Sequence, residues 1–175
     1  MASGDRSLHF SDGFIISCGT VTVDVDRLKM LLIRCRDSGE VYLPKGRKDM
    51  DESLQDAALR ETWEETGVRA ELMRLRITTR ATIPANAAAA AAAVPITSVT
   101  EPLAVSQRMS GGILKIIFWF VAAADSTAAR EEATQQEGED FEALWMGWDE
   151  AITTLTFDDD RRIAEAAVLA MATKK

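Results

Sequence analysis

The sequence predicts an α+β fold, an α/β/α sandwich with a mixed central sheet, built as one domain over residues 1–175. Three observations predict it. β-branched apolar segments precede and follow one clear amphipathic helix, and a second helix ends the chain. The composition, 47% apolar and 27% charged, is that of a water-soluble globular chain. The length fits one domain of ~100–200 residues, and no repeat or linker divides it.

The first part of the chain is expected to form three strands. Gly13–Val25 is apolar and β-branched without a helical stripe, which favours a strand. Arg27–Arg36 alternates in polarity, so we expect a strand with one wetter face. Val41–Leu43 is expected to be a short strand that stops at Pro44, because proline cannot donate to a sheet.

Ser53–Thr66 is the clearest helix. Ser53 followed three residues later by Asp56 resembles a capping box, with aspartate in place of the usual glutamate or glutamine. Gly67 is placed to adopt the left-handed conformation that ends a helix. The apolar stripe of this helix consists of Leu54, Ala57, Ala58 and Leu59.

The centre of the chain is expected to hold a strand over Ala70–Thr82 and then a low-complexity insertion loop at about residues 84–95. The insertion contains seven consecutive alanines and is flanked by prolines, and so short an alanine helix is marginal alone. Thr97–Gln107 and Ile113–Ala124 are expected to form a hairpin around a turn at Arg108–Gly112.

The last part of the chain reads as a strand and a helix. Glu142–Trp148 is expected to form another strand. Asp158–Ala172 is expected to be helical, because acidic residues begin it and Ile163, Ala167 and Met171 lie along one side.

Charge narrows the classes of partner. The net charge of −8 argues against a nucleic-acid surface. Arg27–Lys48 carries seven basic and two acidic residues, whereas Asp49–Thr66 carries seven acidic and one basic. A carboxylate cluster beside a basic segment suits metal-assisted chemistry on a polyanion. The last acidic block, Asp125–Asp160, is expected to be mainly solvated surface.

Sequence features also bear on the environment of the chain. The longest apolar run is too short for the ~20 residues of a membrane helix, so no membrane partner is expected. The first thirteen residues lack a signal-peptide core, which predicts a cytoplasmic chain, although secretion with a removed signal peptide stays open. Cys18 and Cys35 are expected to be reduced. The sequence predicts no oligomeric state.

Three glutamates at i, i+3 and i+4, namely Glu61, Glu64 and Glu65, share one face of the central helix. Their mutual repulsion would be relieved by a hard divalent cation, Mg²⁺ or Mn²⁺, which prefers oxygen ligands. Glu52 can reach the same place, and Arg60 can lock the carboxylates in one geometry. The alternative is a solvated acidic face with ordinary ion pairs between Asp56, Arg60 and Glu64.

The complete pattern from residue 46 to 68 is G-x5-E-x7-R-E-U-x-E-E-x-G-U, where U is a bulky aliphatic residue. On this signature the chain is identified as a member of the Nudix hydrolases. The one departure is Thr62 at the first U position, where we expect a β-branched side chain packed under the loop. The matching positions are Gly46, Glu52, Arg60, Glu61, Glu64, Glu65, Gly67 and Val68.

The resemblance implies a loop–helix–loop that binds Mg²⁺ and hydrolysis of a diphosphate linkage. It implies that Glu64 and Glu65 are metal ligands and that Glu61 is a ligand or a water-orienting group. The Gly46 carbonyl coordinates as well, and Glu52 supports the metal directly or through Arg60. Three candidates for the general base stay open, namely Glu61, Glu64 and Glu139, although Glu139 and Glu142 also read as acidic loop surface.

The substrate is indicated less sharply. Leu43–Arg47, with Pro-Lys-Gly at the entry to the signature, resembles diadenosine polyphosphate hydrolases and plant-type diphosphoinositol polyphosphate phosphohydrolases. The run through Arg47–Asp49 also resembles Nudix proteins of filamentous fungi. A highly phosphorylated small molecule is favoured by many nearby cations, namely Arg34, Arg36, Lys45, Arg47, Lys48, Arg108 and Lys115.

We therefore place inositol pyrophosphate first among the substrates and diadenosine polyphosphate second. Decapping of mRNA is a third enzymatic option. A ligand-sensing domain without turnover is the alternative of another class, and the complete set of glutamates argues against it.

Overall fold

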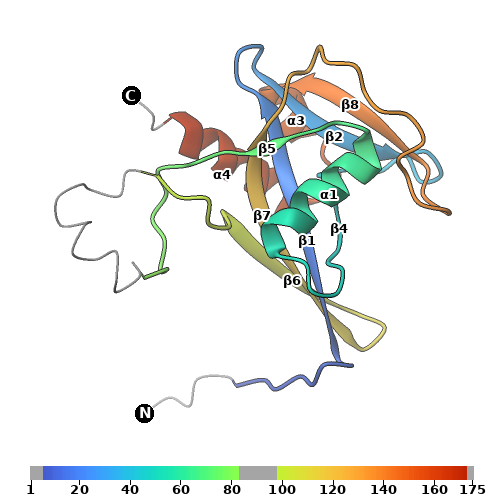
Figure 1. The fold of residues 1–175 in the computed structure, drawn as a ribbon, viewed down its shortest axis with the longest axis vertical. Coiled ribbons are helices and arrows are strands. Elements are labelled where there is room, and N and C mark those ends of the chain that lie inside the picture. The colour runs from blue at the N-terminus through green and yellow to red at the C-terminus, as the bar shows by residue number, and fades with distance from the viewer. Residues whose placement is uncertain (1–5, 83–97, 173–175) are drawn as a thin grey trace.

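The computed structural model describes residues 6–82 and 98–172. Its eight strands form one mixed sheet with helices on both faces, so the predicted α/β/α sandwich is confirmed (Figure 1). The alanine-rich insertion expected at about residues 84–95 lies outside the described residues. In the described part of the chain, no helix has the length and apolar character needed to span a membrane.

The centre of the sheet is a parallel pair of long strands. β1 (Phe14–Asp24) runs beside β7 (Ile113–Ala123), and their register extends from Phe14↔Leu114 to Val23↔Ala123. The remaining pairings are antiparallel, which makes the sheet mixed. On one side of β1 lie β2 (Lys29–Cys35), then β3 (Val41–Tyr42) and β8 (Phe141–Gly147), both paired with β2. On the other side β7 pairs with β5 (Glu71–Leu72) and β6 (Ala104–Ser110).

Two apolar layers flank the sheet. α1 (Leu54–Thr66) packs on one face, where Ala57 and Ala58 meet Cys18 and Phe120. α3 (Trp148–Thr154) and α4 (Asp158–Ala172) cover the opposite face (Figure 1). The core there includes Val21, Met30, Leu32, Trp119, Val121, Leu155, Ile163, Ala167 and Met171.

The second strand, expected over Arg27–Arg36 with one wetter face, is instead covered on both faces. Leu31 and Leu32 point to opposite faces, and both are completely buried. Only the two ends of β2, Lys29 and Arg34–Cys35, are partly exposed. The expected wetter face is therefore absent along most of the strand.

The prediction of one long strand over Ala70–Thr82 is wrong. Only β5 joins the sheet, and a single further bridge links Leu75 to Val99. β6 already pairs with β7 from Ile113 to Trp119, so only the last four residues of β7 remain, and β5 pairs with two of them, Ala122 and Ala123. Apolar side chains of this segment still pack on the core without entering the sheet.

The expected hairpin forms with a shorter turn. β6 continues to Ser110, and a two-residue turn at Gly111 and Gly112, with φ of 58° and 78°, leads into β7. Two glycines with positive φ suit this tight turn, so Arg108 lies in a strand and not in the loop. Of the described part of the expected strand, residues 98–103 lie outside β6, although the Leu103 amide donates to the Trp119 carbonyl at 2.8 Å.

Two elements were not predicted. β4 (Lys45–Arg47) begins directly after Pro44 and pairs with β1, so the chain resumes a strand where we expected it to stop. This is possible because β4 joins a different strand from β3, with Pro44 at the switch. α3 follows β8 without a loop.

Candidate active site

The ends of α1 form as the sequence indicates. The Asp56 amide donates to the Ser53 hydroxyl at 3.1 Å, and that hydroxyl donates to the Asp56 carboxylate at 2.7 Å. Gly67 adopts φ 69° and ends the helix. Gly67 is also needed for space, since a Cβ there would lie 2.1 Å from the Glu131 carbonyl oxygen. The signature helix is therefore set by both its caps and its packing.

Arg60 joins the carboxylates of the signature. Its Nε and Nη2 donate to the two oxygens of Glu52 at 2.8 and 2.9 Å. Its Nη1 donates to Glu61 Oε1 and to Glu64 Oε2, both at 2.8 Å. The hydrogen bonds between Arg60 and Glu52 are the main cause of the raised pKa of the Arg60 guanidinium. They are also the main cause of the lowered pKa of the Glu52 carboxyl. Asp56 contacts Ser53 instead, so the alternative of a simple chain of surface pairs does not describe this network.

Glu61 and Glu65 are buried on the side of α1 that faces β4. The Lys45 amide donates to Glu65 Oε2 at 2.8 Å. A Cβ at position 46 would lie 1.8 Å from Glu61 Oε2, so only glycine lets this carboxylate reach the backbone of β4. Burial raises the pKa of Glu61, and it raises that of Glu65 to about 8. The ionised forms of Glu61 and Glu65 are therefore costly even with Arg60 and Lys45 nearby.

These residues fit a hard divalent cation. In the described part of the chain, no three acidic, histidine or cysteine side chains converge in a metal-coordinating arrangement, because Arg60 lies between the glutamates. The donors are nevertheless carboxylate and carbonyl oxygens, which Mg²⁺ and Mn²⁺ prefer. A cation would also favour the ionised form of Glu61 and Glu65. Glu61, Glu64, Glu65 and the Gly46 carbonyl are the groups that would hold it, as the sequence predicts.

The third candidate base lies at the same place. Glu139 precedes β8, and its charge contributes to the raised pKa of both Glu61 and Glu65. Its carboxylate accepts a hydrogen bond from the Gln136 amide at 3.1 Å. The structure therefore brings Glu139 near the signature, while the identity of the base stays a prediction. Glu142 forms an ion pair with Arg34 on β2.

Thr62, the departure from the signature, is completely buried as expected. Its hydroxyl lies 2.6 Å from that of Thr20 on β1 and donates to the Ala58 carbonyl at 2.8 Å. The Thr20 hydroxyl is in turn 2.7 Å from that of Thr22. Threonine fits here because β1 offers a hydroxyl partner where an aliphatic side chain would have none.

Four of the seven predicted substrate-binding cations gather around one hollow. They line a hollow of about 180 Å³ between β4 and the β6–β7 hairpin, together with Gly46. The four are Lys45, Arg47, Arg108 and Lys115. A polyphosphate could therefore meet several positive charges next to the signature helix.

The other three cations lie elsewhere. Arg34 pairs with Glu142 at 3.3 Å, and Arg36 pairs with Asp140 at 3.0 Å. Both therefore serve the edge between β2 and β8. Lys48 directs its ammonium to the Asp49 carbonyl at 2.6 Å and does not line the hollow.

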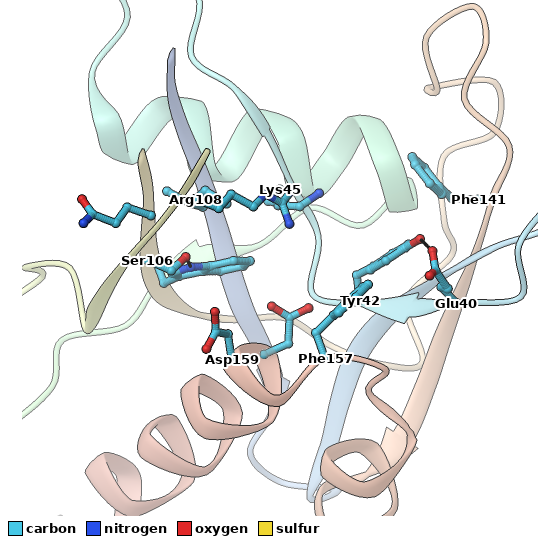
Figure 2. A pocket seen from close by; sticks show the side chains of 12 residues that line it. Glu40, Tyr42, Lys45, Ser106, Arg108, Phe141, Phe157 and Asp159 are labelled. Carbon is cyan, nitrogen blue, oxygen red and sulfur yellow. Dashed lines mark hydrogen bonds between the residues drawn. The ribbon is translucent and has the colours of Figure 1, made fainter. Parts of the chain in front are cut away.

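A second pocket of about 390 Å³ adjoins the hollow and shares Lys45, Arg108 and Ile117 with it. Figure 2 shows Lys45 and Arg108 on one side of this pocket and Asp159 on the opposite side. Tyr42 stacks on Phe157 at an interplanar angle of 10° and a centroid distance of 5.7 Å. The Trp119 indole also lines the pocket.

The pocket is polar at its α4 end. Asp159 and Asp160 begin α4, and the Leu43 amide donates weakly to Asp160 Oδ2 at 3.5 Å. Burial raises the pKa of Asp160. Trp119 Nε1 donates to the Ser106 hydroxyl at 3.0 Å, which fixes the indole plane. Sequence reasoning missed Asp159, Asp160 and Phe157, although a Phe-Asp-Asp-Asp run at a helix start was a usable signal.

A NUDIX domain model matches residues 16–166, and the chain therefore belongs to the Nudix family. Within 46 residues it is 48% identical to Nudix hydrolase 21, chloroplastic, of Arabidopsis thaliana, which covers 26% of this chain and 23% of that protein. Nudix hydrolase 4 of the same plant is 42% identical over 50 residues, or 29% and 24% of the two chains. The aligned segment spans about a quarter of the length of these curated relatives.

Solved structures share the fold over most of the chain. A NUDIX hydrolase from Nitrosomonas europaea has a TM-score of 0.58 at 16% identity, covering 93% of this chain and 91% of that one. The Ap4A hydrolase of C. elegans, in a binary complex, has a TM-score of 0.58 at 18% identity, covering 91% and 98%. At such identities the likeness shows the fold alone.

Proposed function

We propose that this protein is a Mg²⁺-dependent pyrophosphohydrolase that cleaves a diphosphate bond in a nucleoside polyphosphate, with dinucleoside polyphosphates as the leading substrates. One observation carries the proposal. A hollow lined by four cations and by Gly46, against which the Glu61 carboxylate lies, adjoins a pocket lined by aromatic and acidic side chains. The first part suits phosphates, and the second suits a nucleobase.

The signature residues would supply the chemistry. Glu61, Glu64 and Glu65 would hold Mg²⁺, and Mn²⁺ is an expected substitute. When bound, the metal neutralises phosphate oxygens and lowers the pKa of a coordinated water. Arg60 keeps the carboxylates at fixed positions through its four side-chain hydrogen bonds to glutamates. Glu61, Glu64 or Glu139 would accept the proton of the attacking water.

The wall of the larger pocket favours a nucleobase over an inositol ring. Base–aromatic stacking contributes ~1–3 kcal/mol per base, and Tyr42, Trp119 and Phe157 offer ring surfaces. Asp159 and Asp160 could accept hydrogen bonds from base N–H groups. The same carboxylates would repel the phosphates that surround an inositol pyrophosphate. The fold shared with an Ap4A hydrolase is consistent with the same class of substrate.

Inositol pyrophosphates, the first expectation from sequence, remain the second candidate. The observation in their favour is the gathering of Lys45, Arg47, Arg108 and Lys115 around one hollow. Four cations exceed what a nucleoside diphosphate sugar requires. With Arg34 and Arg36 engaged in ion pairs on β2, however, fewer cations face the substrate than the sequence indicated.

A substrate panel tests the proposal. The purified protein is incubated with Mg²⁺ and either diadenosine tetraphosphate, an inositol pyrophosphate, capped RNA or ADP-ribose, and products are separated by ion-exchange chromatography. We expect the highest kcat/KM on the dinucleoside polyphosphate and loss of turnover when EDTA removes the metal. Highest efficiency on the inositol pyrophosphate would select the second candidate. Absence of turnover on every substrate would favour a ligand-sensing domain.

A further inference from the structure

The chain between β7 and β8, Ala124–Asp140, is bound to the C-terminal end of α1. The last turn of α1 has no basic side chain, so its final carbonyls need other donors. The Thr134 hydroxyl donates to the Glu64 carbonyl at 2.8 Å, and Gln135 Nε2 donates to the Glu65 carbonyl at 3.2 Å. Side chains of this segment therefore cap the turn of α1 that carries two signature glutamates.

The segment is itself fixed at two points. The Gln135 amide group pairs with the backbone of Phe141, donating to its carbonyl at 2.7 Å and accepting from its N–H at 3.0 Å. The Glu131 amide donates to the Gly67 carbonyl at 2.9 Å. These contacts tie the segment to the first residue of β8 and to the end of α1. The part of the segment near these contacts is therefore held in a fixed position against the C-terminal end of α1.

The turn that follows brings one amide to a signature carboxylate. Gln136 Nε2 donates to Glu64 Oε2 at 3.1 Å, the same oxygen that accepts from Arg60 Nη1 at 2.8 Å. The turn is closed by two hydrogen bonds between Gln136 and Glu139, each 3.1 Å long. Within the described residues, no hydrogen bond holds the second oxygen of Glu64.

We propose that Gln136 is a positioning residue for the hydrolysis, because its side-chain amide holds Glu64 in the orientation that leaves Oε1 open to the metal or to the attacking water. Gln135 and Thr134 support it by fixing the segment on α1. A neutral donor suits this position, since Arg60 already supplies the positive charge. This inference rests on the proposed function. It extends that function by naming a group outside the signature, Gln136, that sets the geometry of a signature carboxylate.

Gln136→Met tests the inference, since methionine keeps a similar length and flexibility but cannot donate a hydrogen bond. Glu137→Gln is the matched control, because Glu137 is an exposed neighbour in the same turn. Mn²⁺ binding is measured without substrate from the electron paramagnetic resonance signal of the free ion. Kinetics with Mg²⁺ and thermal unfolding are measured on the same samples.

Loss of such supporting contacts typically lowers metal affinity or activity by ~10–100-fold. For Gln136→Met we expect a Mn²⁺ affinity or kcat about 10-fold lower, a KM changed less than about 3-fold and an unchanged melting temperature. Glu137→Gln is expected to match wild type.

Two outcomes would overturn the inference. The first is a Gln136→Met protein with wild-type Mn²⁺ affinity and wild-type kcat, and the second is a wild-type protein that binds no Mn²⁺ at millimolar concentration. The proposed function fails separately, if wild type binds Mn²⁺ but hydrolyses no nucleotide. In that case the Mn²⁺ titrations of the variants still test the role of Gln136.

Discussion

Arg60 organises the glutamates of the signature, because one guanidinium contacts three of them. Glu52, Glu61 and Glu64 each give at least one oxygen to it at 2.8 Å. Arg60 is 20% exposed, so these charge-assisted bonds are partly shielded from water and stronger than surface pairs. Glu65 lies outside this network and is held by a backbone amide of β4 instead.

Glu64→Gln should separate the chemistry from the fold. Glutamine keeps the size and can still accept from Arg60, so we expect an unchanged melting temperature. Turnover should fall by at least ~100-fold, as for loss of one strong transition-state stabiliser. Steady-state kinetics in saturating Mg²⁺ measure it, with Glu71→Gln as an exposed control on β5. A variant retaining more than a tenth of wild-type turnover would remove Glu64 from the catalytic set.

At the scale of elements, the end of α1 depends on a close approach between this helix and the Ala124–Asp140 segment. Gly67 has a positive φ, and the carbonyl oxygen of Glu131 lies only 2.1 Å from the position that a Cβ at residue 67 would take. Gly39, in the turn between β2 and β3, has a similar φ of 74° but open space around it. The pair thus separates backbone strain from steric overlap.

We expect Gly39→Ala to lower the free energy of unfolding by about 1–2 kcal/mol, the cost of a left-handed alanine. Gly67→Ala should cost a further ~1–3 kcal/mol, because the Glu131 carbonyl must also move. Urea denaturation of both variants against wild type measures the two values. Equal losses would show that the Ala124–Asp140 segment yields easily and is not firmly bound to α1.

At the scale of the whole molecule, the candidate substrate site is divided by charge. Cations from β4 and the β6–β7 hairpin line one end, whereas carboxylates from the start of α4 line the other (Figure 2). The two ends are brought together because β1, β4 and β7 are neighbours in the sheet and α4 packs across it. Such a division would orient a substrate with phosphates at one end and a base at the other.

The double substitution Arg47→Ala/Lys115→Ala tests this division. Each lost charge-assisted contact should be worth roughly 1–2 kcal/mol, or about 5–30-fold in kcat/KM. We expect the loss mainly in KM, since these contacts are remote from the bond that breaks. The loss should be greater on diadenosine tetraphosphate than on ADP-ribose and should shrink at high salt. Arg76→Ala, which changes an exposed arginine outside both pockets, is the control. Equal losses on both substrates at every salt concentration would contradict the proposed division of the site by charge.

Local sequence was enough to predict the signature helix. The Ser53 and Gly67 caps, the shared face of Glu61, Glu64 and Glu65, and the central place of Arg60 all follow from 3.6-residue periodicity and spacing within 23 residues. The fold class also followed, because apolar periodicity identifies most strands and helices. β-strand pairing was predicted less well, as the short β5 shows, since the partner edge was taken by a distant strand.

Only the tertiary structure decided the environment of that helix. Tyr42 meets Phe157 across more than a hundred residues, and Gln136 reaches Glu64 across 72. Arg34 is drawn into an ion pair by the register of β2 with β8 and does not face the substrate hollow. These contacts depend on strand order and register, which arise from the packing of the whole chain, whereas the signature depends on neighbours along one helix. The sequence by itself therefore determined the signature helix and its carboxylate cluster, whereas the tertiary structure decided which side chains surround the candidate site.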